Sequence, residues 1–117
     1  MKYLLMIYDD EIARHSLPPD QKTAVHAGYM DLVKSLGPAY VGGAPLQQTK
    51  TAKSVRVRDG KTQITDGPFA ETREQLGGYF LIEADSYDEA AKIAERMPGA
   101  RVGTIEIRPL ADIASPH

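Results

Sequence analysis

The sequence contains no cysteine and no tryptophan. The absence of cysteine excludes a disulfide, a thiolate metal site and a thiol nucleophile. It is typical of a protein of the reducing cytoplasm, which we predict as the location. The longest run of apolar and aromatic residues spans only residues 3–8, after which come three acidic residues. That run is too short for a signal-peptide core or a membrane-spanning helix, so we expect no membrane partner.

An excess of charge of either sign is also missing. The 14 basic and 16 acidic side chains leave a formal charge of -2. This balance removes the positive field of a typical nucleic-acid binder, so we expect no nucleic-acid partner. With 117 residues, the chain has the length of one domain. We predict a single domain over residues 1–110 and a loosely held tail over residues 111–117.

What is present is a regular alternation of strand-like and helix-like segments. Residues 2–8 and 78–84 are apolar on both faces, which is typical of central strands. Residues 21–36 carry apolar side chains at helical spacing and end at Gly37 and Pro38. Ser86 and Glu89 form a capping box that opens a second helix. Its predicted buried side consists of Ala90, Ile93, Ala94 and Met97. Shorter strands are predicted over residues 39–44 and 102–108.

A hairpin is predicted over residues 54–65, because Asp59 and Gly60 suit a two-residue turn between alternating flanks. Counting outward from the turn pairs Val55 with Ile64 and Val57 with Thr62. We expect this face to be buried. The opposite face is basic, and we interpret it as solvated rather than as a phosphate-binding patch.

Without the hairpin, the order is strand, helix, strand, strand, helix, strand. This order predicts an α+β, ferredoxin-like split βαβ sandwich. Two helices cover only one face of such a sheet, although both central strands are apolar on both faces. The simplest cover for the second face is another copy of the sheet. We therefore predict a homodimer of the dimeric α/β-barrel kind.

A motif of mixed character lies between the hairpin and the strand at residues 78–84. It reads Asp-Gly-Pro-Phe-Ala-Glu-Thr-Arg-Glu-Gln-Leu-Gly-Gly over residues 66–78. Together with the hairpin and the closing Ile-Glu-Ile-Arg-Pro at residues 105–109, this motif resembles the DGPF branch of the YCII-related family. The resemblance implies a dimeric α/β barrel in a small bacterial cytoplasmic protein, usually without an assigned activity. It also implies a sigma factor of the extracytoplasmic-function type as a partner.

The motif has two interpretations. In the structural one, Asp66 and Gly67 form a turn, and Phe69 anchors the loop in the core. In the functional one, polar groups of the loop face a small-molecule ligand between apolar walls. The residues assigned to that ligand site are Asp66, Phe69, Arg73, Glu74, Gly78 and Tyr79.

His26 and Asp9 are the candidates for acid–base chemistry. The end of the first strand should lie beside the start of the third, which places Asp9 near Gly78. In the YCII-related family, a helix histidine eleven residues before the glycine that ends the helix is suspected of acting with an aspartate. His26 stands eleven residues before Gly37. An imidazole with a carboxylate partner is a suitable general base near pH 7, whereas the alternative is a solvated histidine on the helix flank.

The sequence therefore supports two hypotheses. The first is a cleft that binds a small polar or aromatic molecule, with lyase-like or isomerase-like chemistry by His26 and with Asp9 or Asp66 as its partner. The second is a non-catalytic interaction module that works with a sigma factor. We expect no cofactor, since the sequence has no Gly-rich phosphate loop. We also expect no metal, because the sequence has only three histidines and the acidic run at residues 9–11 lacks organised partners.

Overall fold

The computed structural model describes residues 1–112, and its centre is a four-stranded antiparallel sheet. The strand order is β2-β5-β1-β6, so β1 and β5 are central, as predicted. A separate two-stranded sheet consists of β3 and β4. The strands are β1 (Lys2–Asp9), β2 (Tyr40–Pro45), β3 (Lys53–Arg58), β4 (Lys61–Asp66), β5 (Gln75–Glu83) and β6 (Thr104–Pro109).

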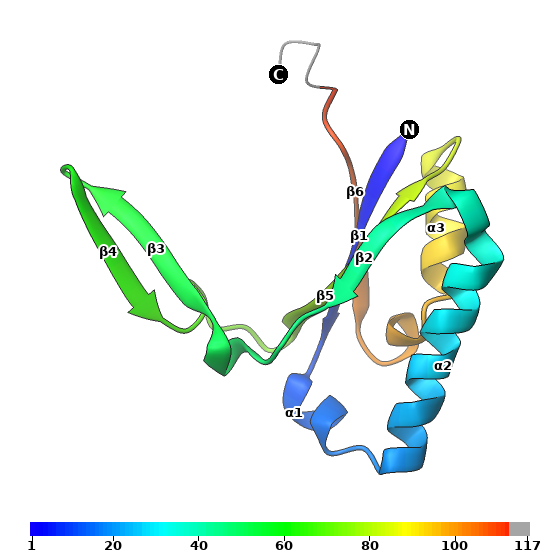
Figure 1. Cartoon of the computed structure of the whole chain (residues 1–117), viewed down its shortest axis with the longest axis horizontal. Helices are drawn as coiled ribbons and strands as arrows, with labels where there is room; N and C mark the ends of the chain where they lie inside the picture. Colours follow the sequence, from blue (N-terminus) through cyan, green and yellow to red (C-terminus); the bar gives the residue numbers. More distant parts are fainter. Residues whose placement is uncertain (113–117) are drawn as a thin grey trace.

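The two long helices pack on one face of the main sheet (Figure 1). With them, the order of elements confirms the predicted ferredoxin-like α+β fold. The helices are α1 (Glu11–His15), α2 (Pro19–Leu36) and α3 (Tyr87–Glu95), with short 3-10 turns η1 (Gly37–Ala39), η2 (Thr49–Thr51) and η3 (Pro98–Arg101).

The core lies between the sheet and these helices. Leu5 and Ile82 come from the central strands, Leu32 comes from α2, and Ala90 comes from α3. Leu5, Ile82 and Ala90 are fully buried. The predicted Ser86 cap of α3 is present, because the Glu89 amide donates to Ser86 Oγ over 3.2 Å, and the Glu89 carboxylate accepts from the Asp85 amide over 3.0 Å. The apolar period of the sequence therefore located the core correctly.

Helix α1 was not predicted, because the sequence placed only a loop at residues 9–18. Asp10 explains the difference. Its carboxylate accepts from the amides of Ile12 and Ala13, at 3.0 and 3.2 Å, and so caps a helix of five residues. The predicted tail lies mostly outside the described residues.

The hairpin of β3 and β4 has the predicted register but not the predicted burial. Asp59 and Gly60 have positive φ values of 53° and 74°, and Val55 pairs with Ile64. However, the hairpin projects from the body, on the side of the sheet opposite the helices (Figure 1). Val55, Val57 and Ile64 are 62%, 59% and 65% exposed, so the expectation of a buried face is wrong for the single chain. We call β3 and β4 the arm.

The second face of the main sheet contributes no side chain to the buried hydrophobic core of residues 1–112. The register places Leu4 opposite Leu81 and Met6 opposite Tyr79, and directly opposite side chains share a face. None of these four side chains belongs to the buried core. We call this surface the open face.

The core predicts a clear contrast between two apolar truncations. Leu5→Ala should lower the free energy of unfolding by about 2–5 kcal/mol, because it leaves a cavity in a fully buried site. Ile12→Ala, at a side chain 77% exposed on α1, should change it by less than about 0.5 kcal/mol. Urea denaturation followed by circular dichroism measures both values. Equal effects would contradict this location of the core.

Candidate functional site

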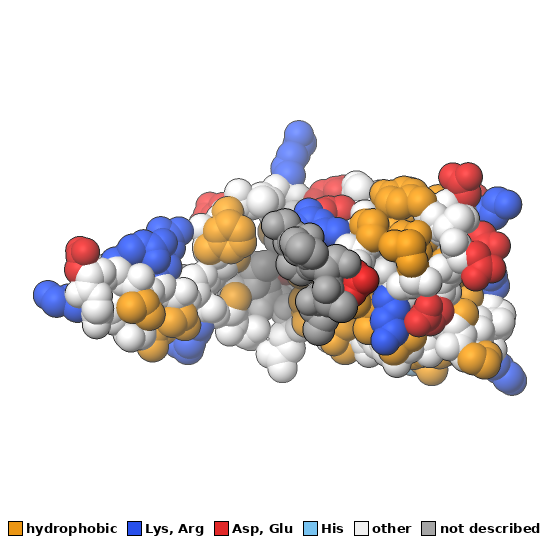
Figure 2. Space-filling view, turned by 90° about the horizontal axis from the view of Figure 1, so that it is seen from above, with side chains coloured by type: hydrophobic (Ala, Val, Ile, Leu, Met, Phe, Trp, Pro, Cys, Tyr) orange, Lys and Arg blue, Asp and Glu red, His pale blue; other side chains and the backbone are white. Residues whose placement is uncertain are grey.

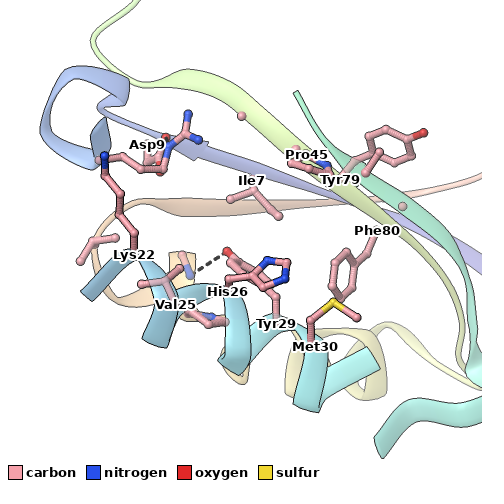
Figure 3. Close-up of a pocket in the computed structure, with 18 of the residues that line it drawn as sticks. Ile7, Asp9, Lys22, Val25, His26, Tyr29, Met30, Pro45, Tyr79 and Phe80 are labelled. Atoms are coloured by element: carbon pink, nitrogen blue, oxygen red, sulfur yellow. Dashed lines mark hydrogen bonds and ion pairs between the residues drawn. The ribbon is translucent and has the colours of Figure 1, made fainter. Parts of the chain in front are cut away.

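A cleft of about 610 Å³ opens between α2 and the sheet, at the end where β1 leaves the sheet. The sheet contributes Ile7, Gly43, Gly78 and Phe80. This wall of the cleft is therefore apolar, and its two glycines leave the backbone of the sheet accessible from the cleft. Helix α2 lies opposite, and α1 closes one end (Figure 3). The cleft is therefore an apolar slot with polar groups at its end and along one wall.

His26 and Tyr29 are the polar side chains that α2 contributes near the middle of the slot. They are three residues apart and so lie on one face of the helix. Figure 3 shows both rings directed toward the sheet. The Tyr29 hydroxyl oxygen accepts a hydrogen bond of 2.9 Å from the Gly99 amide. This bond fixes the oxygen and leaves the hydroxyl proton free to be donated to a ligand.

An ion pair between Asp9 and Arg14 forms the end of the slot. Arg14 Nε lies 2.9 Å from Asp9 Oδ2 and 3.1 Å from Asp9 Oδ1. Arg14 Nη2 is buried and has no hydrogen-bond partner among the described residues. A buried donor without a partner is unfavourable, so a ligand that accepts a hydrogen bond from Arg14 Nη2 would be stabilised.

Two glycines make room for this ion pair. A Cβ atom at Gly77 would lie 2.9 Å from Arg14 Nη2, and one at Gly103 would lie 3.1 Å from Asp9 Cβ and 2.0 Å from the Tyr8 carbonyl oxygen. Any side chain at Gly103 would therefore displace the backbone of β1 at the point where it presents Asp9. Gly77 lies at the bulge where the β1–β5 register shifts.

Burial shifts the acid–base properties of two groups at the cleft. It raises the pKa of Asp9 above its ordinary value of 3.8, although the Arg14 cation acts in the opposite direction. Burial also raises the pKa of Tyr29 above its ordinary value of 10.0. Tyr29 therefore stays protonated near neutral pH and acts as a hydrogen-bond donor rather than as a base.

Of the residues predicted at one cleft, the structure brings together Asp9, His26, Gly78 and Tyr79. Two of these do not lie as expected. Asp9 pairs with Arg14 and not with His26. The Tyr79 ring lies on the other side of the sheet from α2 (Figure 3), so only its backbone borders the slot.

The remaining predicted residues do not line this cleft. Asp66 lies at the root of the arm, 86% exposed, and pairs with Lys53 over 2.7 Å. Phe69 is 83% exposed, so it neither anchors the loop in the core nor forms a wall of the slot. Arg73 and Glu74 border an open depression with Asp10. Glu74 is nonetheless near the end of the slot, because it precedes Gln75, which pairs with Asp9, and its charge adds to the rise in the pKa of Asp9.

The sequence did not identify Arg14, Lys22 or Tyr29 as site residues, although all three line the cleft. Tyr29 is one of the residues at apolar spacing in the helix predicted over residues 21–36, and that spacing gives no signal for its hydroxyl. Arg14 could have been found from Asp10, since a capping aspartate starts a helix that turns Arg14 back toward Asp9. Among residues 1–112, no group of three or more metal-binding side chains lies together, and no helix is long and apolar enough to cross a membrane.

Fold and site together define a small ferredoxin-like protein with a cleft between sheet and helix. The YCII-related domain matches residues 1–114. A protein of Rhizobium meliloti, itself described as uncharacterised, is 38% identical over 95% of this chain and 93% of its own length. The chain belongs to the YCII-related family.

A solved structure of similar fold is 5-chloro-2-hydroxyhydroquinone dehydrochlorinase from Burkholderia phenoliruptrix, in complex with 2,5-dihydroxybenzoquinone. Its TM-score is 0.53 and its sequence identity is 15%, over 95% of this chain and 94% of that one. This similarity confirms the fold class.

The raised pKa of Asp9 predicts a pH dependence of stability. The folded chain holds this proton more tightly than the unfolded chain, so the contribution of Asp9 to stability is complete below about pH 3.8 and is lost as the pH rises through the folded pKa. Relative to Asp9→Asn, the native chain should therefore lose free energy of unfolding as the pH increases from 4 to 7, measured by urea denaturation. A relative gain over that range would show that the Arg14 ion pair outweighs burial.

Proposed function

We propose that this chain binds a small, flat, conjugated molecule with an acidic oxygen in the cleft, and that His26 moves a proton on that molecule. The observation that carries the proposal is the arrangement of His26 and Tyr29 on one turn of α2, facing an apolar slot that a cation borders. A slot between a helix and a sheet suits a planar ring, and its polar groups suit ring oxygens.

The chemistry follows from the state of each group. His26 accepts a proton from the bound molecule and returns it at another atom, which is an isomerisation, or retains it while a leaving group departs, which is an elimination. Tyr29, kept protonated by its burial, donates to the oxygen on which negative charge develops. Arg14 attracts an anionic oxygen, and Asp9 holds the guanidinium in position. A protein of the same fold binds 2,5-dihydroxybenzoquinone, which is a molecule of this class.

A homodimer is part of the proposal. The open face is apolar over both central strands, and a second copy of the same face covers it without a further component. Some loop residues do not reach the cleft of their own chain. In a homodimer, these residues can instead contact the partner copy. Asp66, Phe69 and Arg73 belong to this group.

The second candidate function, a non-catalytic interaction module, is favoured by one observation. Phe69 is exposed, and Arg73 and Glu74 lie at an open depression rather than in the cleft. A docking surface for a protein such as a sigma factor would have these properties. Failure of the native chain to bind any conjugated acid would favour this candidate.

Binding and proton transfer are tested separately with 2,5-dihydroxybenzoquinone as the probe. We expect calorimetry to detect binding, and proton NMR in D₂O to show that the native chain accelerates deuterium exchange at the ring carbons of the probe. His26→Ala should lower the exchange rate by about 10² or more, because a positioned base is lost, while the dissociation constant changes only severalfold. Arg14→Gln should weaken binding about tenfold or more.

Asp31→Asn is the matched control, because Asp31 lies on α2 but outside the cleft. It should leave both measurements unchanged. Exchange that continues at the native rate in His26→Ala would remove His26 from the mechanism. If the native chain does not bind the probe, the proposed ligand class is wrong.

A further inference from the structure

We infer that the arm is a clasp that docks on the body of a second copy of this chain. The inference rests on the proposed homodimer and adds a second contact surface to it. It starts from the apolar stripe of the arm, formed by Val55, Val57 and Ile64, each about three fifths exposed. An isolated two-stranded hairpin is marginal in water, and a covered apolar face would stabilise it.

The direction of the arm favours a second copy as its cover. The arm lies on the same side of the main sheet as the open face, so that the two surfaces form the sides of a V (Figure 1). Figure 2 shows the arm extending from the body, with hydrophobic side chains on its surface. A partner whose sheet meets the open face enters this V and comes within reach of the arm.

The root of the arm is held to the body. The Glu11 carboxylate accepts from the Thr49 amide, over 3.1 Å, and from the Thr49 hydroxyl. Across the root, Ser54 Oγ donates to the Gly67 carbonyl over 2.9 Å, and the Gly67 amide donates to the Ala52 carbonyl over 2.8 Å. The Glu11 bonds hold the segment before the arm to α1, and the other two bonds join the two sides of the root. The root is therefore ordered before the arm meets a partner, which lowers the entropic cost of docking.

Charge favours the same occupant. Residues 53–66 carry four basic and two acidic side chains, a net charge of +2. The whole chain carries -2, so the remainder carries -4. A positive arm that meets the negative body of a second copy gains from electrostatic complementarity, which steers association.

The area of the open face alone is too small for a stable dimer interface, so the arm is needed to complete it. From strand spacing and rise per residue, the open face measures about 20 by 20 Å, or ~400 Å². A stable interface buries about 800 Å² per partner. The arm presents about 10 by 20 Å, and it covers a similar area of the partner. With the sheet, the arm and the surface beneath the partner's arm, each copy contributes about 800 Å².

The absence of native cysteine allows a direct test by single thiol substitutions. Val57→Cys places a thiol on the apolar stripe, and Arg56→Cys places one on the opposite face of the same strand. We expect a thiol-reactive reagent to label Val57→Cys at least tenfold more slowly when the protein concentration is raised from nanomolar to high micromolar. Arg56→Cys should be labelled at one rate throughout. Equal labelling of both thiols in a dimeric protein would overturn the clasp and leave the sheet contact intact.

Two charge substitutions separate the clasp from the sheet contact. Val57→Glu should raise the dimer dissociation constant at least tenfold, whereas Gln63→Glu, which adds the same charge on the opposite face of the arm, should change it much less. Tyr79→Glu, on the open face, should also raise it. Light scattering after gel filtration measures all three, with circular dichroism as the check on folding.

The outcomes are distinct. If only Tyr79→Glu weakens the dimer, the clasp is wrong and the sheet contact stands. If the native chain is a monomer at all concentrations, both are wrong and the arm serves another partner. A tenfold effect of Val57→Glu without protection of Val57→Cys would also contradict the clasp.

Discussion

The constraint on which the rest of the structure depends is a mismatch between the central sheet and its helices. Strands β1 and β5 are apolar on both faces, yet both long helices lie on one face. The covered face forms the core of the chain, and the gap left between α2 and the end of the sheet forms the cleft. The other face can be buried only by something outside the described chain. The cleft and the proposed homodimer are thus two consequences of one sheet.

The end of β1 connects these two consequences. Three consecutive carboxylates follow one another there, and each has a separate task. Asp9 holds Arg14 at the cleft, Asp10 caps α1, and Glu11 holds Thr49 at the root of the arm. Helix α1 therefore carries both the cation of the cleft and the attachment of the arm. This arrangement gives the acidic run a structural explanation that needs no bound cation.

The fold could be predicted from the sequence because its signals are local. The capping box at Ser86, the turn at Asp59 and Gly60, and the two-sided strands all act within a few residues. The burial of the arm could not be predicted, since alternation shows that a hairpin has an apolar face but not what covers it.

For the site, topology brought Asp9 and Gly78 to the same end of the sheet, and helical position placed His26 in the cleft. Arg14 was missed because it lies in α1, a helix that the sequence did not predict, where it pairs with Asp9. The hydroxyl of Tyr29 was missed because its partner, the Gly99 amide, is remote in sequence. The DGPF motif suggested a site by its composition, but its first half begins at the root of the arm and does not line the cleft. The most direct measurement of the central claim is sedimentation equilibrium of the unmodified chain at micromolar concentration. The account predicts a species of twice 12.8 kDa, whereas a single species of 12.8 kDa at every concentration would contradict it.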